Sequence, residues 1–129
     1  MILLDTHVLA WLAGDPNRLS RAASSAIRRA NRAGGVAISS ISLWELAWLF
    51  THGRLQMAGT VESVLEKTAS RAVILPITQK IAALAAQFPT DYSNDPSDRL
   101  IGATALAEGI ALVTKDERIR ACKLLRTIW

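Results

Sequence analysis

The sequence predicts an α/β fold with a central parallel sheet, and two observations lead to that expectation. Short apolar runs that resemble buried strands recur along the chain, at residues 2–5, 36–39, 72–77, 110–113 and 126–129. Longer segments with helical patterning separate them, and glycine, proline or polar residues mark the junctions. This alternation is typical of strand–helix–strand units, whose strands pair in parallel through right-handed crossovers.

Helices are expected between these strands. The first follows Asp5 and continues through Leu12, before the turn signal Gly14-Asp15-Pro16. A helix with a basic face is then expected before Gly34-Gly35, and Pro96 fits the first turn of a later helix. The remaining helices follow from similar signals, and the expected set after the first is 20–32, 42–51, 60–70, 78–88, 96–108 and 116–121.

The bulk composition is that of one globular domain. The chain has 129 residues, half of them hydrophobic, which is enough to bury a core within one domain over 1–129. A single cysteine cannot form an internal disulfide, and no signal peptide or membrane-spanning run is visible, so we expect a soluble cytoplasmic protein. The net charge of +4, rich in arginine, allows a nucleic-acid partner, although a solvated helix face would explain it as well.

Four acidic residues follow or flank the expected strands. Asp5 ends the first strand, Glu45 lies in the first turn after the second, Asp98 lies at the start of a helix, and Asp116 follows the strand at 110–113. Sites in parallel sheets form outside the carboxyl ends of the strands, so these four acids are expected to converge. Clustered carboxylates repel one another unless they are protonated or bind a hard cation, and oxygen ligands favour Mg²⁺ or Mn²⁺ over zinc.

Each acid also has a purely structural interpretation. Ser42 and Glu45 have the S-x-x-E spacing of a capping box, which by itself favours Glu45 as a helix cap. Asp5, Asp95 and Asp116 could each cap the helix that follows them, and Asp98 could be a favourable charge in the first turn of its helix. Caps and metal ligands are not exclusive, and the coincidence of four acids at one edge favours a metal site suited to phosphodiester hydrolysis.

Three further features have two interpretations. His7 could be a general base, but a packed or hydrogen-bonded histidine is favoured, and His52 is expected to cap a helix C-terminus. The segment 43–50 is apolar nearly all round, which fits either a groove for a partner helix or a fully buried helix. Trp11 and Trp48 would line such a groove.

The residues also resemble a known family. The stretches "LLDTHVLAWL", "SISLWELAWL", "NDPSDRLIGATAL" and "LVTKDERI" are similar, in order and spacing, to the four motif blocks of PIN-domain proteins, and most closely to VapC-type toxins of bacterial toxin–antitoxin pairs. This resemblance implies a three-layer α/β/α fold with about five parallel strands. It also implies an endoribonuclease that depends on Mg²⁺ or Mn²⁺, a cognate antitoxin partner and a homodimer.

The resemblance assigns roles to individual residues. Its four acids correspond to Asp5, Glu45, Asp98 and Asp116, with Asp5, Asp98 and Asp116 as metal ligands and Glu45 acting through water. The supporting polar residues correspond to Thr6, Thr114 and Asp95. Two positions depart from the family pattern: Ser97 stands where relatives often have a bulky aromatic, and Gly102 replaces a usual alanine.

Two alternative functions remain. A catalytically silent relative would keep the fold and bind RNA or protein, but it would be expected to lose at least one acid. Phosphoryl transfer through a strand-end aspartate nucleophile is a second alternative, although that chemistry usually needs another acid two residues on, where this chain has His7.

Overall fold

The computed structural model describes all residues, 1–129, and has one parallel sheet of five strands. The strands are β1 (Ile2–Leu4), β2 (Val36–Ser39), β3 (Val73–Leu75), β4 (Ala111–Val113) and β5 (Thr127–Ile128). Their order across the sheet is β3-β2-β1-β4-β5, and every neighbouring pair is parallel. The predicted α/β class and the parallel sheet are therefore confirmed.

Seven α-helices and one short 3₁₀ helix connect the strands. Their bounds are α1 (Thr6–Gly14), η1 (Pro16–Arg18), α2 (Arg21–Arg32), α3 (Ile41–Thr51), α4 (Val61–Ala69), α5 (Gln79–Ala86), α6 (Pro96–Glu108) and α7 (Glu117–Arg120). Each corresponds to an expected helix, except η1, which occupies the predicted turn after Gly14. None of these helices has both the length and the apolar character needed to cross a membrane.

The helix boundaries follow from local capping chemistry. Ser20, Thr60 and Thr78 each accept a hydrogen bond from a backbone N–H in the first turn of the helix that follows, which satisfies a donor that would otherwise lack a partner. Gly109 ends α6 in the left-handed conformation, with φ of 64°, as glycine does at many helix C-termini. Strand β3 is shorter than the predicted 72–77 and stops one residue before Pro76.

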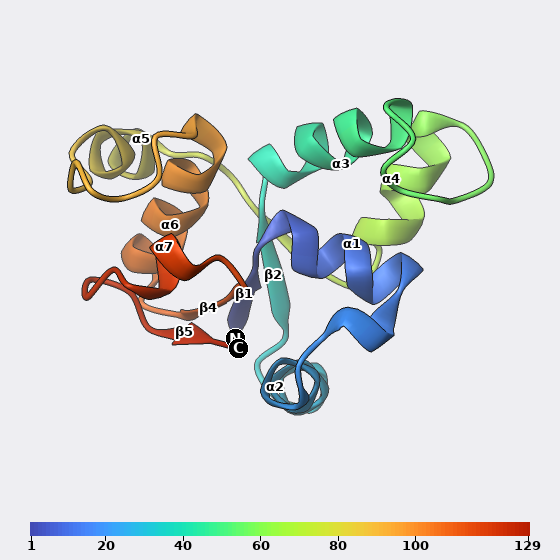
Figure 1. Ribbon diagram of the computed structural model, residues 1–129, viewed down its shortest axis with the longest axis horizontal. Coiled ribbons are helices and arrows are strands. Elements are labelled where there is room, and N and C mark those ends of the chain that lie inside the picture. The colour runs from blue at the N-terminus through green and yellow to red at the C-terminus, as the bar shows by residue number, and fades with distance from the viewer.

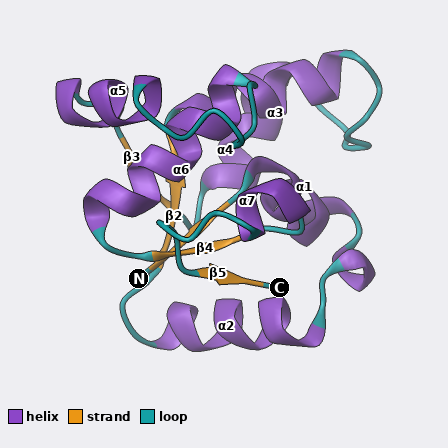
Figure 2. Cartoon of the chain, turned by 60° about the vertical axis from the view of Figure 1, so that its left-hand side comes forward, coloured by secondary structure: helices purple, strands orange, loops and turns teal.

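Alternating side chains divide the core between the two faces of the sheet. Leu4, Ile38 and Val113 pack with α1, α2, α3 and α4 on one face. Leu3 and Leu112 lie on the other face, where they pack with α5, α6 and α7. This period of two produces three layers, and Figures 1 and 2 show the sheet between the two groups of helices.

The β1–β4 pairing has the largest consequence for function. Leu4 lies opposite both Ile38 of β2 and Val113 of β4, so these three strands end within one residue of the same level. Asp5 and Thr114 follow β1 and β4, and Ser39 is the last residue of β2. These three residues are therefore neighbours at one edge of the sheet, and all three are buried. The edge where the acids were expected is thus fixed by strand register.

The two-sided core predicts a large cost for truncating a central strand residue. Leu112 is fully buried against α5, α6 and α7, so Leu112→Ala should lower the free energy of unfolding by about 2–5 kcal/mol in urea titrations. Leu124, which is 52% exposed, provides the matched control, and Leu124→Ala should change stability by no more than about 0.5 kcal/mol. Equal effects of the two substitutions would contradict this description of the core.

Candidate metal centre

Asp5 lies at the junction between β1 and α1 with its carboxylate inside the protein. It is only 6% exposed, and Thr114 Oγ1 donates a hydrogen bond to Asp5 Oδ2 at 2.7 Å. Asp5 occupies the N-cap position of α1, yet its side chain makes no capping hydrogen bond. The capping interpretation of Asp5 is therefore wrong, because its carboxylate is directed to Thr114 instead.

Thr114 also positions Asp116. The backbone N–H of Asp116 donates to Thr114 Oγ1 at 3.1 Å, so one hydroxyl connects two of the acidic residues. Asp116 Oδ1 accepts hydrogen bonds from the N–H groups of Arg118 and Ile119, as expected for the N-cap of α7. Asp116 also lines the pocket described below.

Glu45 is held by a hydroxyl from a different element. Thr6 Oγ1 lies 2.6 Å from Glu45 Oε1 and 2.8 Å from Ser42 Oγ. The predicted capping box is wrong: α3 begins at Ile41, so Ser42 lies inside the helix, and the N-cap Ser40 makes no side-chain capping bond. The carboxylate of Glu45 points toward α1 rather than back to the backbone of its own helix.

Asp98 is held by the loop before α6. Ser93 Oγ donates to Asp98 Oδ2 at 2.7 Å, and the Tyr92 hydroxyl donates to the Asp98 backbone carbonyl at 3.0 Å. Asp95 is the N-cap of α6 and accepts from the Ser97 N–H at 2.8 Å, as the sequence predicted. The roles of Tyr92 and Ser93 were missed, and the only signal in the sequence was their position in the polar loop just before the acidic motif.

Arg99 stabilises the same loop from within. Its guanidinium donates to the backbone carbonyls of Ala85, Phe88 and Ser93 at 2.8–3.3 Å. These carbonyls belong to the end of α5 and the loop that carries Ser93. Arg99 is thus committed to structure, in contrast to the exposed arginines of α2.

Five carboxylates meet in one open pocket of about 300 Å³. They are Asp5, Glu45, Asp95, Asp98 and Asp116, and the remaining lining side chains are His7, Trp11 and Lys115. Asp5, Glu45, Asp98 and Asp116 thus reach one place from four separate segments of the chain. We refer to this pocket as the acid pocket.

His7 does not lie where it was expected. Its side chain is exposed rather than packed, and its ring centroid is 6.1 Å from that of Trp11 in a tilted arrangement. His7 also lines the acid pocket, and because its side chain is exposed, it lies at the rim of that pocket. His52 does cap α3 as predicted, with Nδ1 2.8 Å from the Trp48 carbonyl oxygen.

Burial and mutual repulsion raise the pKa of the acidic groups. Loss of solvation raises the pKa of Asp5, against the opposing effect of the Thr114 hydrogen bond. Burial, with added repulsion from Asp5 and Asp98, raises the pKa of Glu45 to about 7. Burial, with added repulsion from Asp5, raises the pKa of Asp98 to about 6. These shifts mean that the pocket holds its full negative charge at a cost.

The donor set of the acid pocket fits a hard divalent cation. Every carboxylate that lines it is an oxygen donor, and no cysteine is present, which favours Mg²⁺ or Mn²⁺ over zinc. The side chains stand apart around an open pocket, and no three of them are grouped closely enough to hold an ion as they lie. A bound cation would have to draw them together, and this would offset the repulsion that raises their pKa values.

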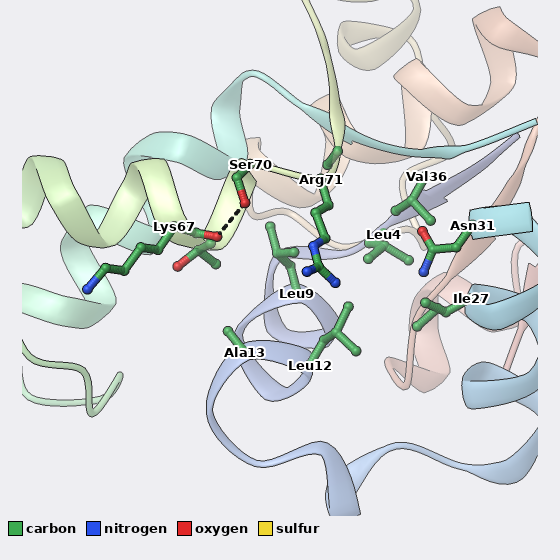
Figure 3. Close-up of a pocket in the computed structure, with 12 residues that line it drawn as sticks. Leu4, Leu9, Leu12, Ala13, Ile27, Asn31, Val36, Lys67, Ser70 and Arg71 are labelled. Carbon is green, nitrogen blue, oxygen red and sulfur yellow. Dashed lines mark hydrogen bonds between the residues drawn. The ribbon is translucent and has the colours of Figure 1, made fainter.

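A second hollow, of about 420 Å³, has a different character. It lies between α1, α2 and α4, and its lining contains no aspartate or glutamate. Leu9 and Leu12 contribute from α1 and Ile27 from α2, and the Arg71 side chain extends among them (Figure 3). This hollow lacks the donors for metal chemistry, so the acid pocket is the candidate centre.

Comparison with known proteins agrees with this geometry. The family model described as "PIN domain" matches residues 2–124. The chain belongs to the PIN-domain family. This PIN domain is 44% identical to "Ribonuclease VapC22" of Mycobacterium tuberculosis, over 99% of this chain and 98% of the relative. The resemblance inferred from the four motif blocks is therefore confirmed.

Solved structures share the fold of this PIN domain. VapBC2 from Rickettsia felis, crystallised with a DNA fragment from its promoter, matches with a TM-score of 0.73 and 23% identity, over 98% of this chain and 97% of that chain. A toxin–antitoxin complex from Klebsiella pneumoniae matches with a TM-score of 0.67 and 22% identity, over 97% and 95% of the two chains. At these identities the likeness concerns the fold, which confirms the predicted three-layer architecture.

The raised pKa values predict how the stability of the metal-free PIN domain depends on pH. The folded protein keeps protons on Glu45 and Asp98 up to about pH 7 and 6, whereas the unfolded chain loses them near 4.5 and 3.8. Stability should therefore decrease as pH rises through this window. In EDTA we expect the melting temperature to be higher at about pH 5 than at about pH 8, by about 4 °C or more. Glu45→Gln should reduce this difference, and an increase of melting temperature over the window would contradict it.

The departure at Gly102 has a structural reason that can be tested. A Cβ at this position would overlap the Tyr92 hydroxyl and lie 2.9 Å from Phe88 Cε2. Gly102→Ala should displace Tyr92 and lower the free energy of unfolding by about 1–3 kcal/mol in urea titrations. Gly14→Ala is the matched control, since its Cβ would meet only Leu55 Cδ1 at 3.7 Å, and it should not destabilise the protein by more than about 0.5 kcal/mol. A fully stable Gly102→Ala variant would contradict the packing of Tyr92 against α6.

Proposed function

We propose that this protein is a metal-dependent endoribonuclease that hydrolyses RNA phosphodiester bonds and acts as the toxin of a toxin–antitoxin pair. The observation that carries this proposal is the convergence of five carboxylates, from distant segments, in one pocket of a basic PIN domain. The 44% identity to a relative named as a ribonuclease supports the same activity. On this proposal the nuclease is a single domain over 1–129.

The acid pocket suggests a separate role for each carboxylate. Asp5, Asp98 and Asp116 would hold Mg²⁺ or Mn²⁺ directly, and Glu45 would act through a water molecule. When bound, such an ion polarises a phosphoryl oxygen and helps to generate hydroxide from water. Burial raises the pKa of both Asp5 and Asp98, and a bound cation would offset the cost of their charged forms.

The supporting residues keep the carboxylates oriented. The hydroxyl of Thr114 fixes one oxygen of Asp5, that of Thr6 fixes one oxygen of Glu45, and that of Ser93 fixes one oxygen of Asp98. In each case the second oxygen stays available for a ligand. Such outer contacts hold metal ligands in place and tune their affinity. Asp95 adds negative charge to the pocket while its Oδ1 caps α6.

The partners follow from the same relatives. Solved structures with this fold include a toxin–antitoxin complex, which supports a cognate antitoxin as the natural inhibitor. We propose that the protein acts in the cytoplasm, where RNA is available, and that it forms a homodimer. The exposed arginines of α2 would contribute to the attraction of the RNA backbone.

Cleavage of RNA provides the direct test. Purified protein should cut total RNA at discrete sites in Mg²⁺ or Mn²⁺ and should stop when EDTA is added. Asp5→Asn should lower the rate by more than about a hundredfold, because even the loss of an outer-shell partner costs about 10- to 100-fold. Sites would be mapped by sequencing the new RNA ends.

Asp91→Asn is the control for that experiment. Asp91 is exposed and lies outside the acid pocket, so the variant should cut like the wild type. Equal cleavage with and without EDTA would contradict the metal-dependent mechanism. Binding of RNA without any cleavage would instead favour the alternative, a catalytically silent PIN-like module.

A further inference from the structure

The outer face of α3 exposes two tryptophans. Trp44 is 60% exposed and Trp48 is 40% exposed, and they lie one helical turn apart on the same face. On the opposite face of α3, Leu46 and Leu49 are buried in the core. The helix is therefore not fully buried, and its outer face does not form a simple apolar groove. Large aromatic side chains are usually buried, so two of them in solvent on one helix face indicate a binding surface.

These tryptophans line a hollow that opens into the acid pocket. The hollow has a volume of about 780 Å³, and His7, Glu45 and Asp95 line both it and the acid pocket. A group of the size of a nucleotide fits such a volume. A strand whose phosphodiester lay in the acid pocket would therefore place an adjoining nucleotide beside α3.

The two tryptophans differ in what already covers them. The His52 ring stacks on Trp48, with ring centroids 3.9 Å apart and planes 16° apart, and the Arg54 guanidinium carbon lies 5.9 Å from the Trp48 ring centroid. The bond between His52 Nδ1 and the Trp48 carbonyl fixes this stack. Trp44 has no aromatic or cationic partner of this kind. The ring of Trp44 is therefore free to stack on a ligand, whereas the ring of Trp48 is already covered by His52 and held in place.

A cationic side chain also lines the hollow. Arg54 lines it and also lines a neighbouring hollow together with Arg18, whose guanidinium lies 4.5 Å above the Trp11 ring. The hollow thus brings acidic residues (Glu45 and Asp95), two tryptophans and Arg54 together in one lining. An aromatic face and a cation in one hollow beside the acid pocket suit a nucleotide, which carries both a base and a phosphate.

We propose that Trp44 stacks on an unpaired base next to the phosphodiester that is cut, and that Arg54 contacts the phosphate on the far side of that base. This inference rests on the proposed nuclease function and narrows its substrate to single-stranded segments. A base in a duplex is already stacked and paired, whereas an unpaired base presents its face to an aromatic side chain.

A second copy of this chain is the competing occupant of the surface. Exposed tryptophans are also typical of subunit interfaces. The lining residues shared with the acid pocket and the presence of Arg54 in the hollow favour RNA. The experiment below separates the two occupants.

The test uses binding that is independent of cleavage. In an Asp5→Asn background, a fluorescently labelled single-stranded RNA would be titrated with protein and followed by anisotropy, beside a duplex of the same sequence. Trp44→Ala should weaken single-strand binding about tenfold, because one base–aromatic stack is lost, and Trp44→Phe should stay within about threefold. Duplex binding should not change in either variant.

Leu124→Ala is the matched control, since Leu124 is also exposed and apolar but lies outside both the acid pocket and the α3 hollow. It should bind single strands like the parent. Unchanged single-strand affinity in Trp44→Ala would overturn the proposal. So would an equal loss for single strands and duplex, since stacking on an unpaired base would then not be the cause.

Sedimentation of the same variants shows whether the α3 surface binds a second copy of the chain rather than RNA. If Trp44→Ala turns a dimer into a monomer whose single-strand affinity equals that of the parent, the surface is an interface between copies and the proposal fails. Failure of the nuclease function itself would be seen separately, as absence of cleavage by the wild type in Mg²⁺ or Mn²⁺. Cleavage by the wild type combined with an unaltered Trp44→Ala variant would overturn only the stacking role.

Discussion

The hydrogen bond between Thr114 and Asp5 is the contact on which the candidate centre depends. It joins residues 109 positions apart, and it forms because β1 and β4 pair in parallel with Leu4 opposite Val113. A one-residue shift of that register would turn each following side chain to the other face of the sheet. The carboxylate of Asp5 is thus tied to the central pairing of the fold, and Asp116 is tied to it through the same threonine hydroxyl.

The acids are held in a common way. Asp5, Glu45 and Asp98 each receive one hydroxyl hydrogen bond, from Thr114, Thr6 and Ser93 respectively. Each of these bonds favours the charged form, but burial and mutual repulsion outweigh it, and the pKa of every one of the three is raised. Without a cation, the fold therefore favours protonation of these carboxyl groups, because their full negative charge is costly. A bound cation would offset that cost, so the pocket favours a cation over further anions.

Local rules predicted some features correctly and failed where tertiary contacts compete with them. Asp95 and Asp116 cap their helices as expected, because a short acid before a helix finds its donors within the next turn. Glu45 had an equally good local signal, but its carboxylate is taken by Thr6 of another helix. The prediction that His7 is packed was wrong for a related reason. Its position beside an apolar run gave no sign that its side chain would remain exposed at the rim of a pocket.

The sequence by itself determined the strand and helix order, the parallel sheet and the edge at which the acids would gather, because hydrophobic periodicity and strand-end position are local properties. The four motif blocks determined the family in the same way. Tertiary structure alone decided which hydroxyl holds which carboxylate, why Gly102 is needed beneath Tyr92, and that Trp44 and Trp48 face solvent next to the acid pocket. These depend on contacts between distant segments, and the spacing of residues along the chain does not encode such distances.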